Sequence, residues 1–226
     1  VMLTANAFLN AQQGQPGDES KQPEAAYAAK DFTRVLGTPG LSDTMLNNHF
    51  KLYQGYVKNT NLLSEKLRAL AAEGKDRAPE YAELKRRFGW EFNGMRLHEL
   101  YFGNMVKGGA ALDPKSKLCA RIAEDFGSAD NCVKEFKAVG AMRGIGWTIL
   151  YYDAVGNKLI NAWINEHDTG HLAGTTPILI MDVFEHAYMP QYGLDRAAYI
   201  SAFFSNLDWD VAEARYSAAA SLIPQR

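Results

Sequence analysis

The sequence predicts an α+β protein, in which an N-terminal antiparallel helical hairpin precedes a C-terminal α/β domain with a small antiparallel three-stranded sheet flanked by helices. Two observations carry this prediction. Apolar residues recur at helical spacing over residues 42–72, with no proline inside. Farther along, Val, Ile, Tyr and Trp gather in runs around a turn at residues 155–157, which is typical of paired strands.

The helical hairpin domain is expected at residues 31–109. Its first helix would begin at Ser42, a residue type that favours the N-cap position. Its second helix would run from about Pro79 to about Met105, broken or bent near residues 88–94, where two glycines stand close together. A Gly- and Pro-containing stretch then marks the end of the domain.

The C-terminal α/β domain is expected at residues 110–226. It would open with a helical hairpin turning near residue 127 and continue with strands on either side of the 155–157 turn. A third strand would lead into a helix over residues 182–188. On that helix Asp182 and His186 would lie one turn apart and point the same way.

Composition bounds the function. The chain has 226 residues, of which 47% are hydrophobic and 22% charged, enough for one sizeable core or two small ones. Its net charge of −2 gives no basic footprint of the kind that nucleic-acid-binding proteins carry. No apolar run reaches the roughly 18 residues that a membrane-spanning helix needs. We therefore expect a globular protein with neither nucleic-acid nor membrane partners.

Residues 1–30 are predicted to be a leader and linker with little fixed structure. Residues 1–13 are apolar and rich in small side chains, and the following residues are rich in Gly, Gln, Glu and Pro. The first stretch is typical either of the tail of a signal peptide or of a simple N-terminal helix. The first alternative predicts a periplasmic or exported protein, and the second allows a cytoplasmic one.

The two cysteines, Cys119 and Cys132, do not form a metal-type C-x-x-C motif. Facing positions in a hairpin centred near residue 127 would bring them close, so a disulfide is geometrically allowed. A disulfide would indicate an oxidising compartment. Two buried free thiols are the alternative.

Two of the five histidines fall on the predicted long helices. His49 and His98 are each surrounded by apolar and aromatic residues, where a single histidine is usually a hydrogen-bonded core residue. Together with Asp182 and His186, however, they form a candidate metal site of three imidazoles and one carboxylate, which suits Fe, Mn or Zn. A dimetal site is not expected, because no Glu stands three residues before any histidine.

Several motifs, in the same order, resemble those of the iron/manganese superoxide dismutases over roughly residues 31–217. DVFEHAY at 182–188, followed by QYGLDRAAYI and NLDWD, is close to the family's DVWEHAYY signature and its continuation. GIGWTIL at 144–150 resembles its GSGWxWL. The resemblance implies a helical domain and an α/β domain with one Fe or Mn ion per subunit held between them. It also implies the four protein ligands: His49, His98, Asp182 and His186.

The activity that the resemblance implies is disproportionation of superoxide to dioxygen and hydrogen peroxide, at a metal ion that alternates between the 3+ and 2+ states. One carboxylate and three neutral imidazoles leave a fifth position for water or hydroxide, whose pKa the cation lowers. Fe is slightly preferred over Mn, and the chain is expected to accept either. A non-redox Zn enzyme and an inactive binding protein on the same scaffold are the alternatives.

Two further residues are expected beside the metal. Tyr56 follows His49 on nearly the same helical face and resembles the family's gateway tyrosine, although the spacing is one residue shorter. His167 is expected to contact the metal-bound solvent, as in an archaeal iron subgroup with His-x-x-x-His in this segment, and His171 would not be a ligand. An alignment shifted by one residue would place Glu166 there instead, but a metal-bound hydroxide would repel its charge.

The resemblance also bears on assembly. Glu185 resembles the acid that reaches the ligand histidine of a partner subunit, which implies a homodimer, or a dimer of dimers, joined through Glu185 and His186. Leu52 and Met189 stand where the family usually has a histidine and a tyrosine that meet across that interface. Their presence puts proton supply by that route in doubt, although Tyr188 remains.

Four more side chains are candidates for shaping the site. Trp147 and Phe184 are expected to form an apolar wall that keeps competing ligands out, in addition to packing in the core. Arg196 and Lys51 are candidates for attracting a small anion, with ordinary surface charges as the alternative.

Overall fold

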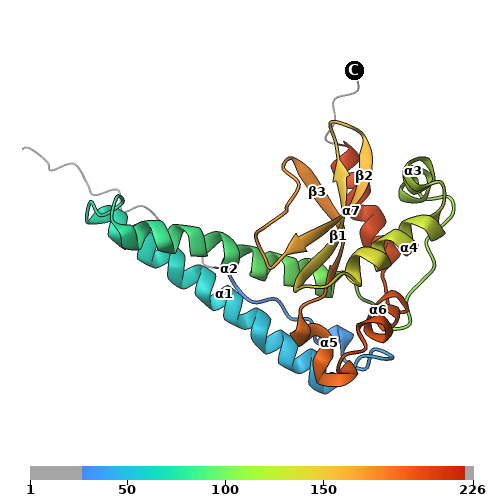
Figure 1. Ribbon diagram of the computed structural model, residues 1–226, viewed down its shortest axis with the longest axis horizontal. Helices are drawn as coiled ribbons and strands as arrows, with labels where there is room; N and C mark the ends of the chain where they lie inside the picture. Colours follow the sequence, from blue (N-terminus) through green and yellow to red (C-terminus); the bar gives the residue numbers. More distant parts are fainter. Residues whose placement is uncertain (1–26, 222–226) are drawn as a thin grey trace, which may run out of the picture.

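The computed structural model describes residues 27–221, and its elements follow the predicted order (Figure 1). A long antiparallel pair, α1 and α2, extends to one side of a body made of the sheet and the remaining helices. This arrangement confirms the α+β prediction. The elements are a short 3₁₀ helix Thr33–Val35 and then α1 Asp43–Ala72, α2 Pro79–Gly103, α3 Lys117–Phe126, α4 Ala129–Gly140, β1 Gly146–Asp153, β2 Lys158–Asn165, β3 Thr175–Asp182, α5 Glu185–Tyr192, α6 Arg196–Phe204 and α7 Trp209–Ser221.

The predicted leader falls largely outside the described residues. Its last few residues are described, and they are attached to the helical pair. The backbone N–H of Tyr27 donates to Asn61 Oδ1 at 2.8 Å, and Lys30 Nζ donates to Glu99 Oε2 at 2.9 Å. The attached chain therefore begins slightly before the expected domain boundary at residue 31.

The helical pair has the expected start but not the expected break. The Ser42 side chain accepts a hydrogen bond from Met45 N at 3.3 Å, which confirms Ser42 as the N-cap of α1. Helix α2 is continuous from Pro79 to Gly103, so the predicted interruption is absent. Packing, and not a helix break, explains the glycine at position 94, because a Cβ on Gly94 would lie 2.6 Å from the Tyr56 ring. The glycine permits close approach of α1 and α2.

The sheet has the strand order β2–β1–β3, and both pairings are antiparallel. Strand β1 is almost wholly buried, as expected for a central strand covered by other elements. Helices α4 and α7 pack against the sheet, and α2 reaches β3 from the helical pair. The register places Trp147 of β1 directly opposite Asp182 of β3, which brings the end of β3 beside the helical pair.

One predicted relationship was wrong: Asp182 and His186 do not share a helix. Asp182 is the last residue of β3, and α5 begins only at Glu185. Between them, Phe184 is in an extended conformation and its N–H donates to Asp182 Oδ1 at 2.8 Å. Strand pairing with β1 therefore overrides the helical spacing, yet the tight turn still brings the two side chains together.

The helical pair and the body share one apolar core. Large side chains from both meet there, among them Tyr53 and Phe102 from the helices, Trp147 from β1 and Phe203 from α6. Within residues 27–221, none of the helices has the length and apolar character needed to cross a membrane.

Candidate metal centre

Four side chains from four separate elements converge where the helical pair meets the body. They are His49 of α1, His98 of α2, Asp182 at the end of β3 and His186 of α5, and one potential ligand atom from each lies within 4.8 Å of all the others. The first three are buried, whereas the His186 side chain is 23% exposed. The site therefore approaches solvent on the side of His186.

Asp182 is the centre of this cluster. Its Oδ2 lies 3.1 Å from His49 Nε2, 3.1 Å from His186 Nε2 and 3.5 Å from His98 Nε2. Its position is fixed from behind, since the Tyr199 hydroxyl donates to its backbone oxygen at 2.7 Å. Burial acts to raise the pKa of Asp182, but His186 and His49 outweigh it and hold the pKa far below its usual range. Asp182 is therefore a buried anion among imidazoles.

The hydrogen bonding of His98 shows whether these four side chains are suited to bind a metal ion. Its Nδ1 lies 2.5 Å from the backbone oxygen of Gly94, and because a carbonyl only accepts, Nδ1 carries the hydrogen. Its Nε2 therefore presents a lone pair toward the cluster, and this buried atom has no hydrogen-bond partner. An unpartnered buried imidazole nitrogen is costly unless something binds it. A cation at the centre of the cluster satisfies it.

The imidazoles have the protonation state that metal binding requires. Burial lowers the pKa of His49, and burial together with the neighbouring His49 lowers that of His98 well below its usual value. Both rings are therefore neutral near pH 7, and each can offer a nitrogen lone pair to a metal ion. Three imidazoles and one carboxylate suit Fe, Mn or Zn, and a single carboxylate leaves at least half of the charge of a 2+ or 3+ ion uncompensated.

Two residues expected beside the metal are joined to each other. The His167 ring, which is fully buried, has its Nε2 2.8 Å from the Tyr56 hydroxyl, and its Nδ1 accepts from the Trp147 indole N–H at 3.0 Å. Burial lowers the pKa of His167 to about 4, so the ring is neutral near pH 7. Because Nδ1 accepts from Trp147, Nε2 carries the hydrogen and donates to Tyr56.

The predicted aromatic wall lies against these rings. Phe184 stacks on His167 with ring centroids 4.6 Å apart and on His186 at 5.1 Å. Trp147 meets His98 edge to face at 5.0 Å. The wall therefore covers both the metal cluster and the histidine beside it, which lowers the local polarity around each.

Glu166 and His171, which also lie in this segment, make their contacts away from the metal cluster. The carboxylate of Glu166 accepts from the Trp90 indole N–H at 3.0 Å in an exposed contact. His171 lies between the Tyr151 hydroxyl and the backbone oxygen of His167 and is not part of the metal cluster. Neither residue is placed to bind the ion.

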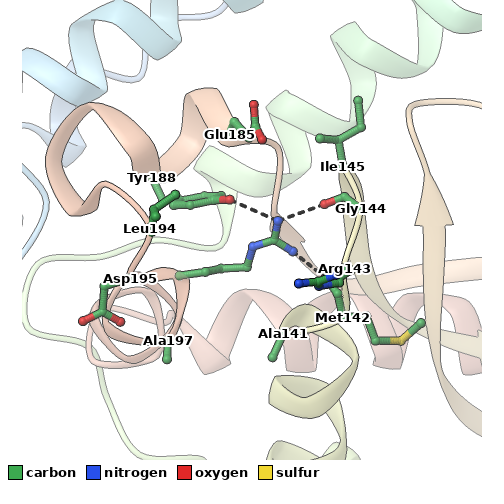
Figure 2. A pocket seen from close by; sticks show the side chains of 11 residues that line it. Ala141, Met142, Arg143, Gly144, Ile145, Glu185, Tyr188, Leu194, Asp195 and Ala197 are labelled. Carbon is green, nitrogen blue, oxygen red and sulfur yellow. Dashed lines mark hydrogen bonds between the residues drawn. The ribbon is translucent and has the colours of Figure 1, made fainter.

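Three more of the predicted residues line a neighbouring pocket of about 570 Å³ (Figure 2). Glu185 and Tyr188 line it from α5, and Arg196 lines it from α6. The Arg196 guanidinium donates to the Tyr188 hydroxyl at 3.0 Å and to the backbone oxygens of Met142 and Gly144 at 2.6 and 2.9 Å. Arg196 thus braces the loop before β1. Lys51 lies exposed on α1.

Two residues that the sequence interpretation did not single out lie at the edge of the site. Trp90 of α2 meets the His167 ring edge to face at 4.5 Å and the Tyr56 ring at 5.5 Å. The Arg87 guanidinium lies 3.9 Å from the centre of the Trp90 ring. Their spacing of three on one helix face was visible in the sequence, but the contact of Trp90 with His167 depends on the tertiary fold.

The disulfide alternative for Cys119 and Cys132 was wrong, because both are free thiols. The predicted hairpin exists as α3 and α4, turned at Gly127 in the left-handed conformation. Cys132, however, is buried against β2, where its thiol and its backbone oxygen both meet the Asn161 side chain. Burial raises the pKa of the Cys132 thiol to about 12. The two cysteines therefore give no support to an oxidising compartment.

Known proteins with similar sequences align with most of this chain. Residues 114–215 match the family model of the C-terminal domain of iron/manganese superoxide dismutases. An iron superoxide dismutase of Aquifex pyrophilus is 36% identical over 84% of this chain and 91% of its own. A manganese superoxide dismutase of Haloferax volcanii is 39% identical over 81% and 91%, and an iron enzyme of Cupriavidus metallidurans is 37% identical over 80% and 90%. With the geometry of the cluster, these similarities show that the chain belongs to the iron/manganese superoxide dismutase family.

Proposed function

We propose that this protein is a superoxide dismutase that holds one Fe or Mn ion per subunit on His49, His98, Asp182 and His186. The observation that carries the proposal is the buried, unpartnered Nε2 of His98, which points at Asp182 beside two further imidazole nitrogens. Nothing in a purely structural role for this cluster accounts for that lone pair.

When bound, the ion supplies a one-electron couple that oxidises one superoxide to dioxygen and reduces the next to peroxide. The chain's own residues set the conditions for this exchange. Asp182 provides the single protein anion, and its hydrogen bond from Phe184 N keeps Oδ1 turned away so that Oδ2 faces the three imidazoles. Trp147 and Phe184 exclude water and larger ligands from the sides.

Of the two protons that hydrogen peroxide needs, one can come from Tyr56 and the other from solvent. His167 donates through Nε2 to the Tyr56 oxygen, which leaves the Tyr56 hydrogen free to donate to a small anion beside the cluster. Burial raises the pKa of Tyr56, so the hydroxyl keeps its proton at neutral pH. His167 in turn is held by Trp147, so the pair is oriented before substrate arrives. We propose that this pair tunes the redox potential of the bound ion.

The choice of metal belongs to the proposal as well. Relatives of similar identity are named as iron enzymes and as manganese enzymes, so similarity favours neither. We propose that Fe is slightly preferred and that either ion supports activity. Both ring nitrogens of His167 are engaged, by the Trp147 indole N–H and by the Tyr56 hydroxyl, so His167 would act on metal-bound solvent through Tyr56 and not by the direct contact expected from the sequence.

Metal content and dismutase activity measured on one preparation test the function. The purified protein, stripped with a chelator and reconstituted separately with Fe, Mn or Zn, is expected to regain activity with Fe or Mn and none with Zn. A fully occupied site that is inactive with both Fe and Mn would contradict the proposal. A native preparation that contains only Zn at full occupancy would favour the alternative of a non-redox metal enzyme.

We also propose a homodimer, or a dimer of such dimers, joined through Glu185 and His186. The support is the presence of exposed apolar side chains among the charged ones that line the pocket in Figure 2, where Met142 is 48% exposed and Leu194 is 90% exposed. The Leu194→Glu variant is expected to shift the protein toward monomer in light scattering after gel filtration. Val155→Glu is the matched control, since Val155 is 95% exposed at the β1–β2 turn, away from this pocket.

Export from the cytoplasm is a further proposal, supported by the apolar, small-residue stretch at residues 1–13, which lies outside the described residues. Fractionation of cells that express the whole gene product tests it, together with determination of the mature N-terminus. Cytoplasmic protein that retains residues 1–13 would contradict export.

A further inference from the structure

The second histidine of the His-x-x-x-His segment has a defined place that metal binding does not explain. His171 is partly buried and lies between two groups: its Nδ1 is 2.6 Å from the Tyr151 hydroxyl, and its Nε2 is 2.9 Å from the backbone oxygen of His167. Tyr151 comes from β1, whose other end carries Trp147. His171 thus links the central strand to the loop that carries His167.

The direction of both hydrogen bonds is fixed. A backbone carbonyl only accepts, so His171 Nε2 carries the hydrogen and donates to His167 O. In the neutral ring Nδ1 then accepts, and the Tyr151 hydroxyl is the donor. Burial raises the pKa of Tyr151, which keeps that donor hydrogen in place. Both hydrogen bonds therefore run in the same direction, from Tyr151 to His171 and from His171 to His167 O. Each ring nitrogen of His171 has a partner.

The loop that His171 binds is closed by backbone hydrogen bonds at its edges, and its other attachments are the Glu166 N–H to Ile145 O and the side-chain contacts of Glu166 and His167. The backbones of Asn165 and Thr169 exchange hydrogen bonds, with Asn165 N to Thr169 O at 2.8 Å, and close a short loop with His167 at its tip. Glu166 within it has a φ of +51°, which is unfavourable for a side chain of this kind. Such a backbone persists only where its surroundings determine it. His171 binds the carbonyl of the tip residue itself.

We infer that His171 is a positioning residue, which fixes the peptide plane of His167 and thereby aims the His167 ring at Tyr56. The ring is then held from two directions, by Trp147 at Nδ1 and by His171 through the backbone. The inference rests on the proposed function, because the aim of this ring matters only if His167 and Tyr56 act beside the bound ion. His171 itself touches neither the cluster nor the substrate.

A double-mutant cycle tests the inference on the metal-loaded enzyme. His171→Phe keeps a ring of similar size and removes both hydrogen bonds. In the otherwise unchanged protein we expect full metal content, a fall in kcat of about 10-fold, typical of a lost supporting hydrogen bond, and a shifted midpoint potential. In a His167→Ala background the same change is expected to lower kcat by less than about 2-fold, because the residue through which it acts is gone.

The other outcomes are informative. An undiminished kcat and unchanged potential in His171→Phe, or equal losses in both backgrounds, would overturn the positioning role while leaving His167 in place. An unchanged kcat in His167→Ala alone would instead overturn the role proposed for His167, and the inference with it. The two failures are therefore distinguishable.

A second pair of variants covers the case in which His171→Phe does not fold. Tyr151→Phe removes only the donor to His171, and we expect a smaller loss of kcat in the same direction with unchanged metal content. Its matched control is Tyr152→Phe, on the next residue of β1, whose hydroxyl donates to Asn157 at 2.8 Å away from the site. A loss in Tyr152→Phe equal to that in Tyr151→Phe would overturn the inference.

Discussion

Tyr56 and His167 are 111 residues apart in the chain, and a 2.8 Å hydrogen bond joins the hydroxyl of one to the Nε2 of the other. The bond links α1 to the loop between β2 and β3, and so it crosses from the helical pair to the body. Both residues pack against Trp90 and His98. A change that separates Tyr56 from His167 is therefore expected to alter the surroundings of the metal cluster, although neither residue is itself a ligand.

The Tyr56→Phe variant separates proton supply from metal binding. It removes only the hydroxyl, so we expect unchanged metal content and an altered turnover at high superoxide or an altered sensitivity to peroxide. Metal analysis and rapid-mixing kinetics on the same preparation measure both. Loss of metal would mean that Tyr56 supports the cluster rather than the reaction.

The Gly94→Ala variant tests the close approach of α1 and α2. The added Cβ would lie 2.6 Å from the Tyr56 ring, so the ring must move and its hydrogen bond to His167 is lost. We expect a destabilisation of about 1–3 kcal/mol in denaturant unfolding, together with the kinetic behaviour of Tyr56→Phe. Gly89→Ala is the control in the same helix: nothing lies within 4 Å of its added Cβ, so a gain of about 0.5–1 kcal/mol is expected.

The Asp182→Ala variant should not retain the metal, because the site loses its only carboxylate and the cation its charge compensation. Asp182→Asn keeps the shape and is expected to weaken metal retention while preserving the fold. Metal content after dialysis measures this, with the exposed Asp130→Ala as control. Purification of Asp182→Ala with full metal and activity would sink the ligand assignment.

The His167→Gln variant is expected to keep metal and fold but to shift the midpoint potential and to change which of Fe or Mn supports the higher activity. The reason is that a Gln amide nitrogen donates with fixed polarity, whereas the imidazole is set by its partners. Redox titration of Fe-loaded and Mn-loaded protein measures the effect. If the potential and both activities were unchanged, His167 would have no influence on the ion.

The two thiols should differ in reactivity and in their effect on alkaline stability. A thiol reagent is expected to label Cys119 but not Cys132 in the native protein, and both after denaturation. Since folding raises the pKa of Cys132 from 9.0 to about 12, the unfolded chain loses this proton first, and stability is lost as the pH rises above about 9. Cys132→Ser should show a weaker decline in denaturant midpoint between pH 9 and 11. Identical declines in Cys132→Ser and in the unchanged protein would contradict burial of the Cys132 thiol.

The elements and the cluster were predictable because regular local patterns carry them. His49 and His98 lie on helices whose apolar spacing runs over many residues, and the strand runs are bounded by clear turns. Asp182 was misplaced, since a spacing of four residues suits a helix as well as a strand followed by a turn. Pairing with Trp147 decides between them, and that pairing is a contact between distant segments.

Other features could not be predicted for the same reason. The sequence near Gly94 reads as a helix break, and only the Tyr56 ring packed over it explains the glycine. The hydrogen bonds from Trp147 to His167 and from Trp90 to Glu166 join residues 20 and 76 positions apart. Local propensity contains no information about such contacts.

His49 and Asp182, which meet at 3.1 Å, are separated by 133 positions in the chain. An ion bound to both closes a very long loop and acts as a reversible cross-link between the N-terminal helices and the sheet. Chain entropy makes such closure costly in the unfolded state, and the cost grows only slowly with loop length. The metal-loaded protein should therefore unfold as one cooperative unit. Without the ion, the shared apolar core is what still joins the helical pair to the sheet, and the protein is expected to unfold at a lower temperature in calorimetry.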